Sequence, residues 1–175
     1  MGPHTSVGSL TVCRGVDLIQ LDEGALIGRL NWITAYPSDR SDFFATVPDR
    51  TPVLILHEHA AITSRHIIDC TATIVIGRFS TVAGYRSQLV THTINLAESR
   101  QDAVPIRIGE YCFVGTNCVI LGGSILPDYS VLAANAVLNE PLPDGFVLYG
   151  GVPARAVRAL SKDLGYFQRR SGVVN

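Results

Sequence analysis

Residues 108–138 read IGEYCFVGTNCVILGGSILPDYSVLAANAVL and carry an aliphatic side chain at every sixth position. These aliphatic residues are Ile108, Val114, Ile120, Leu126, Leu132 and Leu138. A small residue follows each of the first five after four positions, and these residues are Cys112, Cys118, Ser124, Ser130 and Ala136. Neither an α-helix nor a long strand repeats every six residues, so the pattern indicates a short unit that is used again and again.

Each small residue precedes the next aliphatic residue by two positions, which puts both on one face of a strand. The pattern therefore predicts short strands that send one small and one large side chain into a shared interior. The corners between strands include Asn117, Gly123 and Asn135, residue types that tolerate a positive φ. Such a repeat is typical of a parallel β-helix, with about 18 residues in a three-sided coil. Cys112 and Cys118 then lie on neighbouring sides, and we expect reduced core thiols there.

Composition narrows the range of partners. The chain has 175 residues, with 14 Lys and Arg against 15 Asp and Glu, and it has no basic run interleaved with aromatic residues. We therefore do not expect a nucleic acid partner. The mean hydropathy of +0.26 is high, yet no stretch approaches the roughly 18 apolar residues of a membrane span. Residues 1–9 do not resemble a secretory signal, so we expect a cytoplasmic protein.

The repeat is ragged or absent in other parts of the chain. From Val12 to Ile33 it is irregular, with Val12, Leu18 and Ile27 as expected core positions. Turn-forming residues over about 36–52 predict an excursion from the coil, in which Phe43 and Phe44 either anchor the loop or wall a substrate pocket. A polar, aperiodic stretch over about 95–105 predicts a second excursion. We expect one β-helix domain over 1–158 and a helical tail over 159–175, with Ser161 as its cap.

His92 is the strongest candidate for chemistry, because it stands where the repeat fails and just before an irregular stretch. The step of six from Val82 reaches Gln88, where the aliphatic residue is missing. Spacing alone leaves two orientations open for His92. An inward imidazole would be a core group bonded to a carbonyl, whereas an outward one would be a general base with an ordinary pKa of about 6.5. His57, His59 and His66 either build a zinc site or are solvated corner residues.

The repeat, the Thr91-His92 pair and the closing segment Gly151-Val152-Pro153-Ala154-Arg155 together resemble the hexapeptide-repeat acyltransferases. Within that family the chain is most similar to the sugar O-acetyltransferases related to maltose and galactoside acetyltransferase. The resemblance implies an all-β, left-handed parallel β-helix and a homotrimer with acetyl-CoA in the groove between subunits. It also implies that His92 removes the proton of the acceptor and that no metal is needed.

Matching the family's donor groove to this sequence gives six cofactor-binding candidates: Phe113, Thr116, Ala134, Asn139, Arg155 and Arg158. The chain departs from the family pattern at Glu140, where a lysine is common, and at Leu121-Gly122-Gly123, where a Pro-Gly corner is common. These departures affect the expected contacts to the phosphates of the donor.

We therefore predict an acetyl-CoA-dependent acetyltransferase that acts on a hydroxyl or amine of a sugar or of a polysaccharide or glycolipid precursor. Four polar residues near His92 are the acceptor-binding candidates: Tyr85, Arg86, Gln88 and Asn95. Two alternatives stay open. One is a γ-carbonic-anhydrase-like zinc enzyme that uses His66, His92 and a third histidine across an interface, and the other is a non-catalytic scaffold. The residues between each inward pair are apolar, which favours cover by neighbouring subunits: Phe113, Val119, Ile125, Val131 and Val137.

Overall fold

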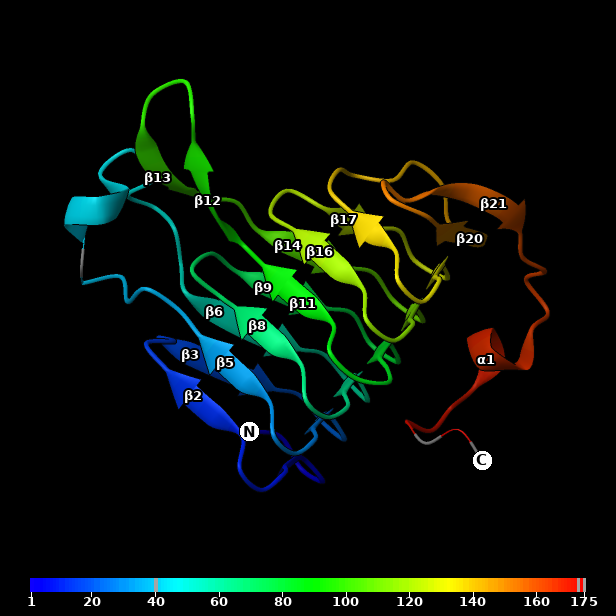
Figure 1. Cartoon of the computed structure of the whole chain (residues 1–175). Helices are drawn as coiled ribbons and strands as arrows, with labels where there is room; N and C mark the ends of the chain where they lie inside the picture. Colours follow the sequence, from blue (N-terminus) through cyan, green and yellow to red (C-terminus); the bar gives the residue numbers. More distant parts are fainter. Residues whose placement is uncertain (40, 173, 175) are drawn as a thin grey trace.

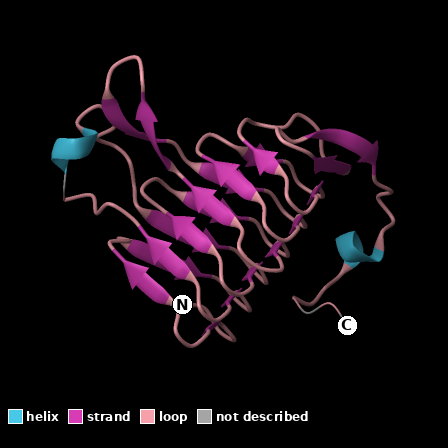
Figure 2. Cartoon of the chain, viewed as in Figure 1, coloured by secondary structure: helices cyan, strands magenta, loops and turns pink. Residues whose placement is uncertain are grey.

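The protein forms a three-sided column of short parallel strands, seen side-on in Figures 1 and 2. The computed structural model describes residues 1–39, 41–172 and 174. The first sheet stacks β1 (Ser6–Val7), β4 (Leu26–Ile27), β7 (Ala61–Ile62), β10 (Thr81–Val82), β15 (Phe113–Val114), β18 (Val131–Leu132), β20 (Val147–Gly150) and β21 (Arg155–Ala159). The second stacks β2 (Val12–Arg14), β5 (Trp32–Thr34), β8 (Ile67–Asp69), β11 (Gln88–Val90), β16 (Val119–Leu121) and β19 (Val137–Leu138). The third stacks β3 (Leu18–Leu21), β6 (Val53–Leu56), β9 (Ile74–Ile76), β14 (Ile106–Ile108) and β17 (Ile125–Leu126).

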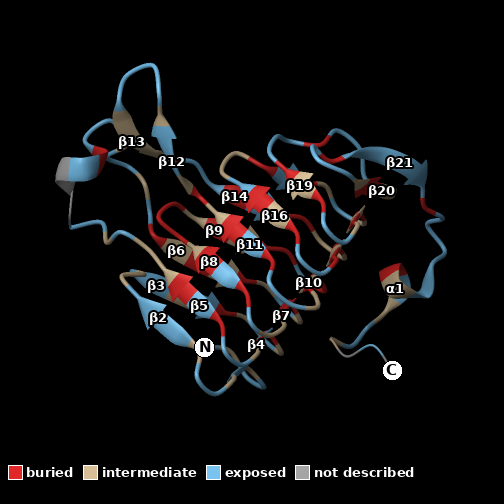
Figure 3. Cartoon of the chain, viewed as in Figure 1, coloured by how far each residue is buried: buried red, intermediate tan, exposed pale blue. Residues whose placement is uncertain are grey.

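The six-residue repeat builds the interior of the column as predicted. All six aliphatic residues from Ile108 to Leu138 are at most 1% exposed, and the five small residues between them are fully buried. Figure 3 shows this buried band running through successive strands. The corner positions Tyr111, Asn117, Gly123, Tyr129 and Asn135 have φ values from 52° to 85°. The predicted corners therefore have the left-handed backbone that a sharp bend requires.

In the first coil the predicted core positions are partly wrong. Ile27 is buried, but Val12 and Leu18 are 39% and 51% exposed and point outward. The inward register is set by stacking on the next coil, where Cys13 pairs with Ile33 and Ile19 pairs with Leu54. Val12 and Leu18 each directly precede an inward residue, so their spacing of six is the period of the repeat at the outward position.

The break in the repeat before His92 is a one-residue insertion at a corner. Gly84 has a φ of 71° and Arg86 a φ of 62°, so this corner has two left-handed residues where the next coil has Asn117 alone. As a result Leu89, and not Gln88, pairs with the core residues Ile68 and Ile120 and is fully buried. The interior continues through the break without a gap.

Both excursions leave the column at the corner between the second and third sheets. The first joins β5 to β6 and contains a short 3₁₀ helix, Ser41–Phe44, while Arg40 lies outside the described residues. The second is an antiparallel hairpin of β12 (His92–Asn95) and β13 (Arg100–Ala103), so it begins three residues before the predicted stretch. Polar residues along both strands concealed this hairpin in the sequence. In Figure 1 the hairpin and the 3₁₀ helix project together from one end of the sheets.

A ladder of aromatic rings runs along the corner between the third and first sheets. His59, Phe79, Tyr111, Tyr129 and Phe146 succeed one another from coil to coil, with ring centroids 4.7–5.2 Å apart. All five have φ values of 52–58°. The repeated left-handed bend therefore lines up the rings, and each extends the stack by one coil.

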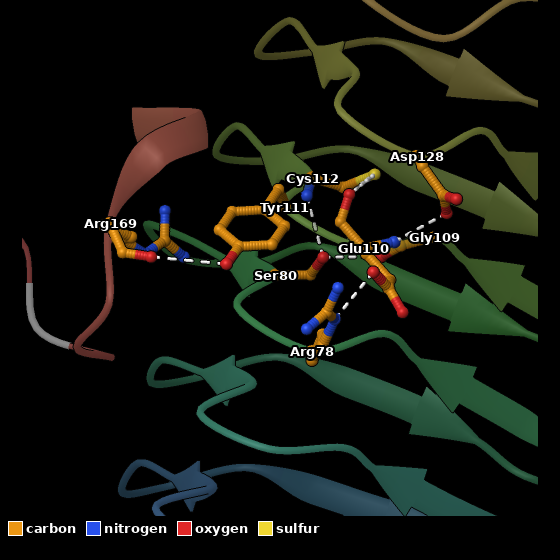
Figure 4. Close-up of polar contacts among 8 residues, drawn as sticks. All are labelled: Arg78, Ser80, Gly109, Glu110, Tyr111, Cys112, Asp128 and Arg169. Carbon is orange, nitrogen blue, oxygen red and sulfur yellow. Dashed lines mark hydrogen bonds and ion pairs between the residues drawn. The ribbon is translucent and has the colours of Figure 1, made fainter. Parts of the chain in front are cut away.

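The C-terminal segment packs on this aromatic ladder. Its helix α1 covers only Gly165–Gln168, with Leu164 at the N-cap position, and Ser161 Oγ accepts a hydrogen bond from the Asp163 N–H. Phe167 is buried edge-on against Tyr129 and Phe146. Figure 4 shows Arg169 beside Tyr111, whose hydroxyl donates to the Arg169 carbonyl at 3.3 Å. Val173 and Asn175 of the expected tail lie outside the described residues.

The structure also describes the cysteines of the repeat and the helices that were considered as membrane spans. Cys112 and Cys118 are buried free thiols as predicted, and burial raises the pKa of Cys112 to about 12. Within the part of the chain that the structure describes, every helix is too short or too polar to cross a bilayer.

Candidate active site

His92 stands where the chain leaves the column to form the hairpin. The residue before it, Thr91, is fully buried, and its hydroxyl donates to the Asp69 carbonyl at 2.9 Å and accepts from the Ala72 N–H at 2.9 Å. These bonds tie the departure point to the coil below. They fix the backbone from which the His92 side chain extends.

The imidazole of His92 is half-buried and held on several sides. Its Nε2 lies 2.6 Å from Gln101 Oε1 across the hairpin. The rings of Tyr36 and Phe44 meet it edge-on, with centroids at 6.0 and 5.3 Å. A carbonyl oxygen at Gln101 requires a proton on Nε2, which leaves the lone pair on Nδ1 as the basic position of the neutral ring.

A cavity of about 430 Å³ opens beside this imidazole. Its lining comes from three successive strands of the second sheet, from the first excursion and from the start of the hairpin: Arg14, Gly15, Thr34, Ala35, Tyr36, Pro37, Asp69 and His92. Arg14, Thr34 and Asp69 are register partners that stack from coil to coil. The stacking of coils thus brings together side chains whose successive separations in the sequence are 20 and 35 residues.

Arg50 holds the first excursion against this cavity. Its Nη1 donates to the Tyr36 carbonyl at 2.7 Å and its Nη2 donates to the Pro37 carbonyl at 2.8 Å, while its guanidinium lies 4.1 Å from the centre of the Phe44 ring. Desolvation lowers the pKa of Arg50, although a guanidinium keeps its charge in proteins. Phe44 is 1% exposed and anchors the loop, and Phe43 is 57% exposed.

The six predicted donor-binding residues fall in three places. Phe113 and Arg158 share the outer face of the first sheet, since Phe113, Val131, Leu148 and Arg158 are successive partners. Thr116 and Ala134 border that face at the corner toward the second sheet. Asn139 follows β19 at the end of the column, and Arg155 forms an ion pair with Glu140 at 2.6 Å. The carboxylate at Glu140 therefore engages one of the two predicted phosphate-binding guanidinium groups.

The predicted acceptor-binding residues do not meet His92 within one chain. Tyr85 and Arg86 line a separate cavity of about 360 Å³ with Arg65, Thr116 and Asn117. That cavity lies at the opposite end of β11 from His92. Gln88 points outward from β11, and Asn95 lies in the hairpin, where its Oδ1 accepts from the Glu98 N–H at 3.2 Å.

Comparison with solved structures identifies proteins that share this fold. No protein-family model matches the sequence, and no curated protein matches it. The acetyl-CoA complex of the hexapeptide-repeat acetyltransferase VCA0836 from Vibrio cholerae matches with a TM-score of 0.60 and 25% identity over 79% of this chain and 72% of its own. The chain therefore shares the left-handed β-helix fold of this hexapeptide-repeat acetyltransferase.

Two other structures share this hexapeptide-repeat fold. A mutant of AntD, an N-acyltransferase from Bacillus cereus in complex with dTDP and coenzyme A, has a TM-score of 0.61 and 12% identity over 91% of this chain and 88% of its own. The polySia-specific acetyltransferase NeuO has a TM-score of 0.51 and 16% identity over 89% of this chain and 87% of its own. None of these three is described as a maltose or galactoside acetyltransferase, so that part of the resemblance stays a prediction.

The histidines of this hexapeptide-repeat chain do not support the zinc alternative. His66 is 1% exposed inside the column, where its Nδ1 accepts from the Ser87 N–H at 3.1 Å and its Nε2 lies 2.9 Å from Thr63 Oγ1. Both ring nitrogens therefore have hydrogen-bond partners inside the column. Among the residues the structure describes, no three metal-binding side chains come together.

The sequence made His92 a candidate but did not predict the residues that surround it. Arg14, Thr34, Tyr36 and Asp69 line the cavity, and Gln101 orients the imidazole. One signal was present: Arg14, Thr34 and Asp69 each directly follow an inward residue on a strand of the second sheet. A polar residue at that place in three consecutive coils marks a polar strip beside the corner.

Proposed function

We propose that this hexapeptide-repeat chain is an acetyl-CoA-dependent acetyltransferase in which His92 is the general base for a sugar hydroxyl or amine. The observation that carries the proposal is the half-buried imidazole of His92, which is oriented by Gln101 and opens on a cavity of about 430 Å³. The similarity to VCA0836 in complex with acetyl coenzyme A supports the choice of donor.

The geometry suggests how the proton moves. With the Nε2–H donating to Gln101, His92 Nδ1 accepts the proton of the acceptor as its oxygen or nitrogen attacks the thioester carbonyl. The bond from the acceptor to the acetyl carbon forms, the C–S bond breaks, and the leaving thiolate takes the proton back from the imidazolium. A positioned base of this kind typically contributes on the order of 10² to 10⁴ in rate.

A homotrimer would complete the site. We assign Phe113, Thr116, Ala134, Asn139, Arg155 and Arg158 to the donor groove between subunits, on the basis of the family resemblance. Tyr85 and Arg86 lie at the far end of β11 from His92. In a trimer that corner of one subunit can face the His92 cavity of the next, which would bring Tyr85, Arg86, Gln88 and Asn95 to the acceptor. The cytoplasmic location stays a prediction.

The test is the release of free CoA thiol from acetyl-CoA by the variant His92→Ala, with a panel of sugars as acceptors. We expect turnover to fall at least about a hundredfold, with the far-ultraviolet circular dichroism spectrum and the acetyl-CoA affinity by calorimetry unchanged. His4→Ala, at an exposed histidine in the first coil, is the matched control and should behave like the wild type. Near-wild-type turnover in His92→Ala contradicts the role as base, and a wild type that does not bind acetyl-CoA supports the scaffold alternative.

A further inference from the structure

The cavity beside His92 extends well beyond the imidazole itself. Its lining reaches from His92 above to Arg14 and Gly15 in the first coil. Along the second sheet, Arg14, Thr34, Asp69 and Val90 are successive register partners, and His92 comes two residues after Val90. Neighbouring strands are about 4.8 Å apart, so Arg14 lies about 14 Å from the level at which the chain reaches His92. A pyranose bound at the imidazole is shorter than this distance.

The two ends of the cavity differ in charge. At the lower end the Arg14 side chain is exposed and forms no hydrogen bond or ion pair with any residue that the structure describes. Asp69, between Arg14 and His92, is held in place instead, since its Oδ1 accepts from the Thr71 N–H at 2.9 Å and from the Thr91 hydroxyl at 3.2 Å. One oxygen of the Asp69 carboxylate therefore has hydrogen-bond partners within the corner, while the guanidinium of Arg14 has its donors available for a ligand.

An aromatic wall joins the two ends. Tyr36 lines the cavity and meets the His92 ring edge-on at 6.0 Å. Its backbone is fixed by the Arg50 guanidinium, so the position of the wall is set by the first excursion. Aromatic rings provide the flat apolar surface against which a sugar ring can pack.

We propose that the acceptor is an anionic glycan whose negative charge binds Arg14 while a hydroxyl or amine of another unit lies at His92. The charge is a carboxylate of a neighbouring acidic sugar or a phosphate linked to the acetylated sugar, because a guanidinium binds both anions in a forked geometry. This inference rests on the proposed function, since it names the substrate class of the same site.

The test compares acceptors that differ in charge. Lactose is the neutral probe, 3′-sialyllactose adds a carboxylate to the same disaccharide, and UDP-N-acetylglucosamine carries phosphates. We expect the wild type to favour at least one anionic probe. Arg14→Gln should raise the KM for that probe at least tenfold, with the kcat and the KM for acetyl-CoA unchanged, and should leave lactose kinetics as they are. Arg14→Lys should give an intermediate KM, because it keeps the charge but loses the fork.

The control is Arg107→Gln, at an exposed arginine on the outer face of β14 in the third sheet. It removes the same charge at a distance from the cavity and should change none of these values. Equal effects of Arg14→Gln and Arg107→Gln overturn the proposal, as does equal use of lactose and both anionic probes. If the wild type transfers acetyl to none of the three probes, the proposed function fails. The anion site is then tested separately, by calorimetric binding of the same probes. Binding of an anionic probe that is abolished by Arg14→Gln then supports the anion site. Equal binding of lactose and the anionic probes overturns it.

Discussion

At the scale of single residues, two histidines of this column lie in opposite environments. His92 stands outside the stacked coils with one ring nitrogen bonded to Gln101. His66 is sealed within them, and its own backbone N–H donates to the Asn31 side chain at 2.9 Å. The difference follows from the corner that each occupies. An ordinary corner turns the histidine inward, whereas the corner that carries the hairpin leaves it beside a cavity.

The buried histidine predicts a loss of stability in weak acid. Burial lowers the pKa of His66 to about 4, compared with about 6.5 in an unfolded chain. Below pH 6.5 the unfolded chain therefore binds a proton that the folded one does not. We expect the free energy of unfolding to decrease as the pH falls from about 6.5 to about 4, by about 1–2 kcal/mol at pH 5. Urea denaturation at pH 7 and pH 5 measures this change.

The control for the acid effect is His66→Gln, which cannot titrate in this range. Its stability at pH 7 is expected to be lower, because the hydrogen bonds to Ser87 and Thr63 change, so the comparison concerns the difference between the two pH values. Most carboxylates titrate below pH 5 and contribute little to it. An equal pH dependence in the wild type and in His66→Gln would contradict the assignment.

At the scale of the elements, a corner can absorb an extra residue without disturbing the strands around it. Gly84 is that residue, and the space it occupies is narrow. A Cβ there would lie 2.5 Å from Cβ of Thr116 in the next coil, and the φ of 71° disfavours any side chain. Thr116 also binds this corner, since its hydroxyl donates to the Tyr85 carbonyl at 2.9 Å.

Gly84→Ala should therefore destabilise the protein by about 2 kcal/mol or more, from the left-handed backbone and the contact with Thr116 together. Gly165→Ala is the matched control, because a Cβ at Gly165 meets no atom within 4 Å and alanine favours the helix that begins there. The urea midpoint should fall for the first variant and stay or rise for the second. Equal midpoints would show that the corner relaxes around the added methyl group.

The elements also show how far the sequence predicts the structure. Where the step of six is unbroken, from Ile108 to Leu138, it identified every inward residue and the corners. It missed Leu89, because one inserted glycine shifts the spacing while the stacking of strands restores the register. It missed the His92 cavity for a related reason, since Arg14, Thr34 and Asp69 come together only through pairing between coils. A single sequence shows the six-residue period along the chain. It does not show which residues of successive coils pair with one another.

At the scale of the whole molecule, the outer face of the second sheet carries an exposed apolar row in its first three coils. Val12, Trp32 and Ile67 form one row of register partners that are 39%, 53% and 49% exposed. A continuous apolar row of this kind favours contact with another protein surface. The row lies on β2, β5 and β8, the strands that also contribute Arg14, Thr34 and Asp69 to the His92 cavity.

We expect the wild type to sediment with three times the mass of a single chain, and the double variant Trp32→Glu, Ile67→Glu to sediment as a monomer. Leu164→Glu is the control, because Leu164 is 42% exposed in the C-terminal segment, which packs on the corner between the third and first sheets. Analytical ultracentrifugation measures all three. A monomeric wild type would contradict the trimer, and a trimeric double variant would place the interface on another face.

Both excursions start from the same corner and are separated by one coil with an ordinary bend. Each begins and ends on strands that are already paired above and below. Lengthening a loop between fixed ends costs little, about 0.6 kcal/mol for each doubling. Segments exchanged at this corner would thus alter which acceptor is chosen while the supporting framework kept its shape. For the acetyltransferase that we propose, we expect acceptor specificity to change when these two stretches of chain are transplanted.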